Sequence, residues 1–185
     1  MSEEIVISTE EKMEKTIQGL GKELATVRAG RANPALLDKV MVDYYGVATP
    51  LNQLSNISAP EPRLLVIQPW DKSAIGAIEK GILKSDLGLT PNSDGNIIRI
   101  AIPQLTEQRR KDLVKLVKKM AEDSRVAVRN IRRDANEDIK RQEKSGDISQ
   151  DDSRRLQEEI QELTNQYVEK ANQILSAKEE EIMEV

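Results

Sequence analysis

Apolar residues in three segments of this 185-residue chain recur at alternating spacings of four and three. That spacing repeats along one face of an α-helix, so it predicts amphipathic helices at residues 9–29, 106–144 and 150–182. A helix with one narrow apolar stripe has to bury it. Three such helices do so most simply against one another. We therefore predict an elongated antiparallel three-helix bundle.

The three stripes consist mainly of aliphatic side chains, because only 2% of the residues are aromatic. The first stripe holds Met13, Ile17, Leu20, Leu24 and Val27; the second holds Leu113, Val117, Met120, Ser124, Ala127 or Val128, Ile131 and Ala135; the third holds Leu156, Ile160, Leu163, Tyr167, Ala171 and Ile174. The predicted helix starts are Ser8 with Glu11 for the first helix, Thr106 for the second, and Ser149 with Asp152 for the third. Gly30 is the predicted C-terminal cap of the first helix.

The middle of the chain has a different character, since all seven prolines lie between Pro34 and Pro103. Runs rich in β-branched and aromatic residues at 40–45, 64–68 and 97–102 predict strands. Asp94-Gly95 is typical of a hairpin turn, and residues 72–87 have the pattern of one amphipathic helix through Ile75, Ile78, Ile82 and Leu83. Trp70 is expected to pack inside the domain. This composition predicts an α+β fold in which a small β/α/β domain is inserted into the bundle.

We place the bundle at residues 1–30 and 105–185, and the inserted domain at 31–104. An inserted domain is joined to its host by two crossings. Because both crossings are short, we expect them to form a two-strand hinge of limited freedom. The predicted hinge residues are Arg31, Ala32, Asn33, Pro34, Pro103, Gln104 and Leu105.

Composition excludes several functions. The chain contains no cysteine and no histidine, so it lacks the usual zinc ligands, a thiol nucleophile and an imidazole base. We expect neither an enzyme nor a cofactor. The N-terminus is acidic, and no apolar run approaches the ~18 residues of a membrane helix. We therefore expect a soluble, cytoplasmic monomer that does not bind membranes.

The net charge of −4 hides a strong asymmetry. Residues 106–146 hold thirteen basic and eight acidic side chains, whereas residues 147–185 hold four basic and eleven acidic ones. On a helical wheel of the second helix the two signs separate, and Glu122 is the one acid among the bases. The bases that line one flank and the back of that helix, here called the basic strip, are Lys111, Lys118, Arg125, Arg129, Arg132 and Lys140.

A row of arginines on a helix edge suits phosphate groups, because the planar guanidinium can donate two parallel hydrogen bonds. The second helix has no aromatic residue to stack on bases, which favours contact with the backbone of folded RNA. The alternative is a solvated face whose cations form ion pairs with acids on neighbouring helices. Arg28 and Arg31 likewise have two interpretations, as phosphate contacts or as cations at the end of the first helix.

Several segments together resemble the ribosome recycling factor family over the whole chain. They are Gly30–Pro34, Val42–Gly46, Asp86–Leu89, Leu105–Lys111 and Val126–Asn136. Gln108 departs from the pattern, because the family often has an acid there. The resemblance implies an L-shaped molecule similar in outline to transfer RNA, with a mobile inserted domain.

The resemblance also implies a function. The family binds the large ribosomal subunit across the aminoacyl and peptidyl sites, and with elongation factor G and GTP it splits the post-termination complex. The bundle is its anchor on ribosomal RNA, which implies RNA-binding roles for Arg110, Arg129, Arg132, Arg28 and Arg31. With the strip residues Lys111, Lys118 and Arg125 they form the predicted RNA-binding set. The alternative class is a structural or chaperone-like helical protein that binds other proteins.

Overall fold

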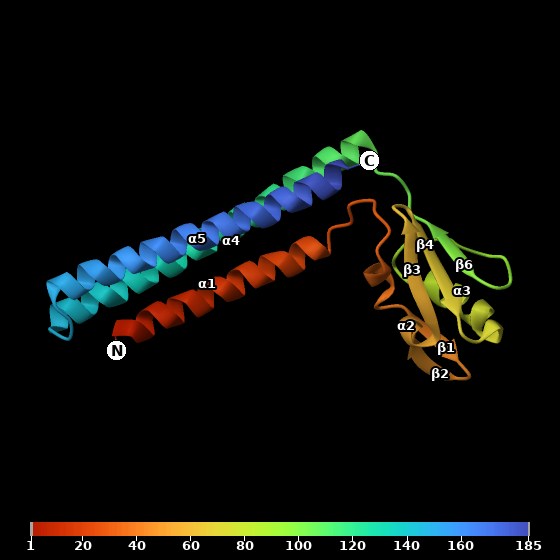
Figure 1. The fold of residues 1–185 in the computed structure, drawn as a ribbon, viewed down its shortest axis with the longest axis horizontal. Helices are drawn as coiled ribbons and strands as arrows, with labels where there is room; N and C mark the ends of the chain where they lie inside the picture. The colour runs from red at the N-terminus through yellow and green to blue at the C-terminus, as the bar shows by residue number, and fades with distance from the viewer. Residues whose placement is uncertain (1, 185) are drawn as a thin grey trace. The chain divides into compact units, whose positions relative to one another are not determined.

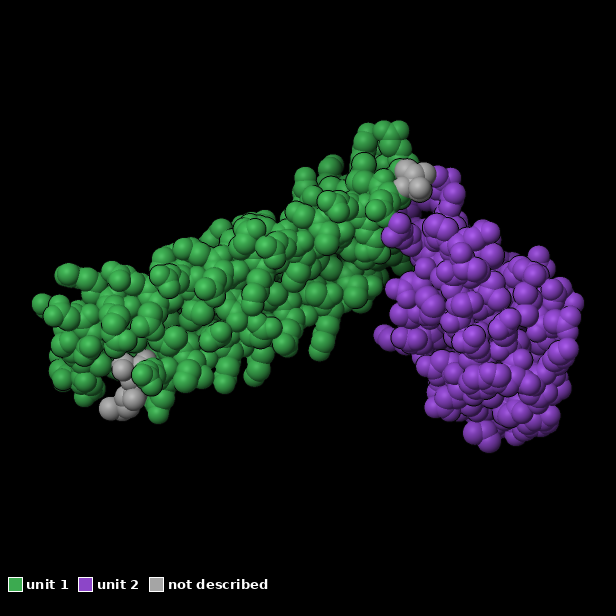
Figure 2. Space-filling view, in the orientation of Figure 1, with its two compact units in different colours: residues 1–29, 106–185 green, residues 30–105 purple. Residues whose placement is uncertain are grey.

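The structure, a computed structural model, describes residues 2–184. The chain divides into two compact units (Figure 2). Unit 1 comprises residues 1–29 and 106–185, and unit 2 comprises residues 30–105. Between residues 2 and 184, none of the helices combines the length and the apolar character that a membrane span requires.

Unit 1 is a bundle of three long helices, α1 (Ser2–Ala25), α4 (Glu107–Ser145) and α5 (Gln150–Met183). At about 1.5 Å per residue the 39-residue α4 is roughly 60 Å long. Helices α1 and α5 run in one direction and α4 in the other (Figure 1). The antiparallel three-helix bundle is therefore confirmed.

The apolar stripes form the core of this bundle. All five residues of the first stripe are buried. In α4, Ala121 and Ile139 are buried, whereas Met120, Ser124 and Ile131 are only half-buried. The stripe prediction therefore erred locally in the long helix, because a period of 3.6 residues drifts from a strict seven-residue repeat.

Two of the predicted helix starts are confirmed. The Thr106 hydroxyl accepts a hydrogen bond from the Arg109 amide at 3.1 Å, and the Ser149 hydroxyl accepts one from the Asp152 amide at 3.0 Å. These bonds satisfy amide donors that the first turn of a helix leaves unpaired.

The predicted ends of the first helix are wrong. Helix α1 begins at Ser2, so Ser8 lies inside it, and acids in its first turn favour the early start. It ends at Ala25, where the Thr26 hydroxyl donates to the Glu23 carbonyl at 2.6 Å. Gly30 lies beyond the helix end and does not cap it. Its φ of +74° is a conformation that favours glycine.

Tyr167 links two helices of the bundle and makes the free energy of unfolding depend on pH. Burial, and then a hydrogen bond to Glu14, raise the pKa of Tyr167 to about 12. Unfolded chains keep a tyrosine pKa near 10, so between about pH 10 and 12 the unfolded state loses its proton first. The contribution of this group to stability is therefore complete below about pH 10 and is lost as pH rises through about 12.

We expect urea unfolding, followed by circular dichroism, to show wild type more stable than Tyr167→Phe at about pH 8. The difference should shrink above about pH 10, because the variant has no proton to lose at this position. A difference that stays constant from about pH 8 to about pH 12 would contradict this prediction.

Unit 2 contains two antiparallel sheets. Strands β1 (Met41–Tyr44) and β2 (Val47–Pro50) form a hairpin. Strands β3 (Ser55–Glu61), β4 (Leu64–Pro69), β5 (Pro91–Ser93) and β6 (Ile98–Ala101) form a sheet in the order β3-β4-β6-β5. The helical elements are η1 (Pro34–Leu37), α2 (Leu51–Leu54), η2 (Lys72–Ala74) and α3 (Ile75–Lys84).

The core of unit 2 is aliphatic. It contains Leu65 and Ile67 of β4, Ile98 and Ile100 of β6, and the inner face of α3, with Ile78 and Ile82. Helix α3 also approaches β1 closely, because a Cβ atom at Gly81 would lie 2.8 Å from the Met41 carbonyl oxygen. The close approach explains why glycine occupies this helical position.

Several predictions for this unit are confirmed and others are wrong. The Asp94-Gly95 turn joins β5 to β6, and Asp94 accepts the amides of Asn96 and Ile97. The predicted helix at 72–87 ends at Lys84, and Leu83, expected on its apolar face, is 62% exposed. Trp70, expected to pack inside the domain, is 69% exposed.

Candidate nucleic-acid interface

The basic strip runs along α4, away from the buried stripe of that helix. Lys111, Lys118, Arg125 and Arg132 follow one another at intervals of seven residues. Seven residues are almost two helical turns, so these side chains lie nearly in line. The alignment places them on the flank of α4 that faces α5, as the hydrogen bonds of Arg125 and Arg132 to α5 show.

The α5 side chains that bond to this flank are neutral amides. Arg132 Nη1 donates to Gln161 Oε1 at 3.3 Å, and Gln161 Nε2 donates to Asn165 Oδ1 at 2.9 Å. Within the described part of the chain, Arg132 forms no ion pair. An amide can orient a guanidinium group but leaves its charge intact. Arg132 therefore keeps a full positive charge at the bundle surface.

Arg129 is partly neutralised by an acid on its own helix. Its Nη1 lies 3.6 Å from Glu122 Oε1, and its side chain is 42% exposed. The hydrogen bond and charge of Arg125, and then the charge of Arg129, hold the pKa of Glu122 below its usual value. One carboxylate thus serves two arginines, and the cluster keeps a net charge of +1.

Arg125 is held more tightly than the other strip residues. Its side chain is only 17% exposed, and its Nε and Nη2 donate to Glu122 Oε2 at 2.9 and 2.7 Å. Its Nη1 donates to Asn172 Oδ1 of α5 at 2.8 Å. With its donors engaged in this way, Arg125 ties α4 to α5 and has little left to offer a ligand.

The other predicted contacts on α4 are of two kinds. Lys118 and Lys140 are exposed and form no ion pair with any described residue, whereas Lys111 pairs with Glu107 at 3.2 Å. Arg110 is half-buried, and its Nε is buried with no hydrogen-bond partner among residues 2–184. Lys118 thus offers more unpaired charge than Lys111.

Three exposed cations beside the strip were missed from the sequence. Lys115, Lys119 and Arg133 lie on the outward side of α4, next to the predicted residues. The spacing Lys111, Lys115, Lys119 was the available signal, because residues four apart share a helix face. Outside α4, Arg28 and Arg31 are exposed on the segment that follows α1.

The predicted hinge residues differ in how firmly unit 2 holds them. The Ala32 amide donates to the Pro62 carbonyl at 2.7 Å, and the Asn33 side chain caps η1, which begins at Pro34. On the other crossing, the Ile102 amide donates to the Arg63 carbonyl at 2.9 Å. Both crossings are therefore fastened to the β3–β4 turn.

Gly30 and Leu105 mark the place where the two crossings meet. A Cβ atom at Gly30 would lie 2.9 Å from Leu105 Cγ, so the crossings lie side by side at the edge of unit 2. Pro103 and Gln104 are exposed and belong to no helix or strand. Of the two, Gln104 is the better placed to change backbone conformation, because the ring of Pro103 fixes its own φ.

The chain combines a helical bundle that has a basic edge with an inserted α+β unit. Residues 20–183 match the family model described as ribosome recycling factor. The chain is 65% identical to the ribosome-recycling factor of Bacillus subtilis and 63% identical to that of Heliobacterium modesticaldum, with full coverage of both chains in each case.

Two solved structures agree with the sequence relatives. A solution structure of the ribosome recycling factor has a TM-score of 0.77 and 43% identity, and the match covers 100% of this chain and 98% of the other. The Thermus thermophilus ribosome recycling factor, built with Escherichia coli elongation factor G bound to the E. coli post-termination complex, has a TM-score of 0.65 and 47% identity, with full coverage of both chains. The chain belongs to the ribosome recycling factor family, whose members are non-enzymatic, cytoplasmic translation factors.

Proposed function

We propose that this protein recycles ribosomes after translation termination. It binds the large subunit across the aminoacyl and peptidyl sites, and together with elongation factor G and GTP it splits the post-termination complex. The observation that carries the proposal is the full-length match to a recycling factor in complex with elongation factor G and the post-termination complex.

Within this function, the basic strip supplies affinity for ribosomal RNA. Arg132 supports this role best, since its partner Gln161 is neutral and leaves the guanidinium charge available for a phosphate. Lys118 and Arg129 add charge on the same helix. Arg125 acts mainly by holding α4 and α5 together, so its side chain sets the geometry of the strip. The proposed contact set is completed by Arg110, Lys111, Arg28 and Arg31.

The paired crossings act as a hinge during splitting. Two chain segments restrict motion more than one flexible tether does. A force that elongation factor G applies to unit 2 can therefore be transmitted to unit 1. The fastening of Ala32 and Ile102 to the β3–β4 turn supports a stiff unit 2 that moves as a whole. The proposed points of rotation are the ψ angle of Pro103 and both backbone angles of Gln104.

Co-sedimentation with large ribosomal subunits over a salt series tests the anchoring role. Counterion release predicts that log affinity falls linearly with log salt concentration. With about four phosphate contacts, affinity should drop roughly 10²-fold between about 50 and 200 mM salt. Binding that hardly changes with salt would instead favour the helical protein-binding class, which relies on apolar contacts.

A further inference from the structure

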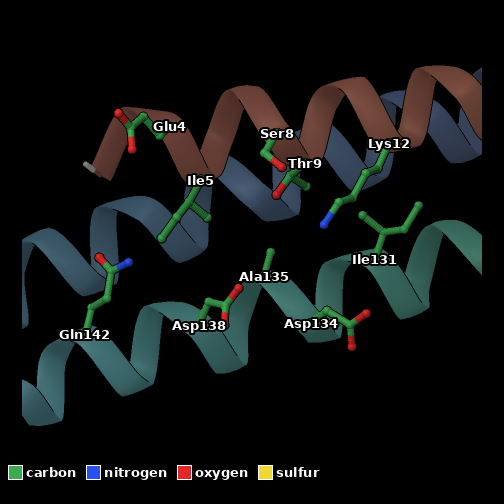
Figure 3. A pocket seen from close by; sticks show the side chains of 10 residues that line it. All are labelled: Glu4, Ile5, Ser8, Thr9, Lys12, Ile131, Asp134, Ala135, Asp138 and Gln142. Carbon is green, nitrogen blue, oxygen red and sulfur yellow. The ribbon is translucent and has the colours of Figure 1, made fainter.

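The pocket between α1 and α4 already holds a charged side chain (Figure 3). The ammonium group of Lys12 points into the space between the two helices, and the carboxylate of Asp134 points away from it. A ligand would have to displace the Lys12 group. The pocket is therefore a poor ligand site, and a reactive peptide link in unit 2 is the more informative feature.

Asp94-Gly95 is the only place in the chain where glycine follows an aspartate or an asparagine. Such a link can rearrange in water without an enzyme, because glycine has no side chain to hinder attack by its own amide nitrogen. That nitrogen attacks the side-chain carboxyl carbon of Asp94, loses its proton, and displaces one carboxyl oxygen, which leaves as water. The product is a cyclic succinimide.

Hydrolysis of the succinimide restores the lost water and can change the path of the main chain. Water adds to the main-chain carbonyl of Asp94, and the bond from that carbonyl to the Gly95 nitrogen breaks. The chain then continues through the side-chain carboxyl carbon. The product, isoaspartate, has the same atoms as aspartate but adds one carbon atom to the main chain. That carbon would lie between β5 and β6, beside the pairing of Ser93 with Ile98, and would disturb their register.

The fold holds the Asp94 carboxyl group in its unreactive, ionised form. Its Oδ1 accepts the amides of Ile97 and Asn96 at 3.0 and 2.9 Å, and its Oδ2 accepts Arg99 Nη1 at 3.0 Å. Hydrogen bonds from Ile97, Asn96 and Arg99, in that order of strength, lower the pKa of Asp94 to about 2. Succinimide formation needs the neutral acid, because a carboxylate loses its oxygen far less readily. Relative to the ordinary pKa of 3.8, this pKa reduces the neutral fraction at neutral pH by more than about tenfold.

The Gly95 amide, which would make the attack, is engaged as well. It donates to Ser93 Oγ at 3.1 Å. Attack requires this nitrogen to lose its proton and to face the Asp94 side chain, whereas the hydrogen bond directs the proton at Ser93. The Asp94 amide donates to the Ile97 carbonyl at 3.3 Å, and this bond closes the turn. Both reacting groups are therefore restrained while the turn is intact.

We propose that Asp94 is the site of spontaneous isoaspartate formation in this protein, and that the folded turn suppresses the reaction through Ser93, Arg99 and the amides of residues 96 and 97. The modification therefore marks molecules in which the β5–β6 turn has opened. It belongs to unit 2, whereas the basic strip belongs to unit 1. The proposal does not depend on the recycling function.

Incubation of the full-length protein at neutral pH, below its unfolding temperature, tests the proposal. Peptide mapping with electron-transfer fragmentation measures isoaspartate at position 94. In guanidinium chloride, where the turn is lost, isoaspartate should form at least about tenfold faster than in the folded protein. In the folded protein, Arg99→Gln should accelerate the reaction about two- to fivefold, the range of one exposed ion pair. Ser93→Ala should accelerate it about two- to tenfold, the range of one hydrogen bond.

Arg63→Gln is the matched control, because Arg63 is an exposed arginine of the β3–β4 turn, at the opposite end of the sheet from the β5–β6 turn. It should leave the rate unchanged, since surface substitutions away from specific contacts have little effect. Circular dichroism verifies that each variant is folded during the incubation. Equal rates in folded and denatured wild type would overturn the proposal. Equal acceleration by Arg63→Gln and Arg99→Gln, or no acceleration by either Arg99→Gln or Ser93→Ala, would overturn it as well.

Discussion

Replacing Arg132 by alanine is expected to weaken binding to large ribosomal subunits by about 1–3 kcal/mol, the range of a charge-assisted hydrogen bond. The side chain contributes little to the bundle, since its partner is one neutral amide at 3.3 Å. The unfolding temperature should therefore change little. Co-sedimentation at fixed salt measures the loss, and thermal unfolding by circular dichroism verifies the fold.

Arg155→Ala is the control for this experiment. Arg155 is an exposed arginine of α5 whose guanidinium already lies near two acids, Asp152 at 3.8 Å and Glu159 at 3.1 Å. Removing it deletes the same chemical group but no unpaired charge, so affinity should stay nearly unchanged. If the two variants bind equally well, the basic strip does not anchor the protein.

Gln104→Pro is expected to leave binding almost intact and to slow subunit splitting by about tenfold or more. Proline fixes its own φ and restricts the residue before it, so a second proline directly after Pro103 would stiffen this exposed crossing. Splitting by elongation factor G and GTP is measured by the fall in light scattering. Binding is measured separately by co-sedimentation without elongation factor G.

Gln104→Ala controls for the loss of the side chain, because it leaves the backbone as free as before. The hinge proposal requires the alanine variant to split subunits at the normal rate. Normal splitting by the proline variant would show that rotation at this crossing is not needed.

The bundle was predictable because its helices obey local rules. Each apolar stripe is long, and the hydroxyl caps at Thr106 and Ser149 act within three residues of their own position. The start of α1 was missed because a tertiary contact overrides the local signal. Ser8 and Glu11 imitate a cap, but the helix continues through them because Ile5 and Val6 pack against the bundle core.

The inserted unit was harder to predict because pairing between distant strands decides it. Strand β3, with the sequence Ser-Asn-Ile-Ser-Ala-Pro-Glu, has one β-branched apolar residue and little intrinsic strand preference. It forms because β4 pairs with it from Ser55 to Ser58 and again, after a register shift, at Glu61. Burial is equally non-local, which explains the error at Trp70.

At the candidate interface, the sequence predicts which residues share a helix face but not what lies opposite them. The wheel placed Arg125, Arg129 and Arg132 together and could not tell them apart. The neighbouring α5 presents an amide to Arg132 and another to Arg125, and Glu122 turns toward two of the three arginines. Side-chain packing between helices therefore assigns the roles.

The few aromatic residues are divided between the two units in a way that suits spectroscopy. Trp70 is the single tryptophan, and it lies exposed in unit 2. Unit 1 contains Tyr167 and no other aromatic side chain. Tryptophan fluorescence of the unlabelled protein therefore reports on unit 2 alone, and quenching of Trp70 by a partner would reveal contact with that unit without an added dye.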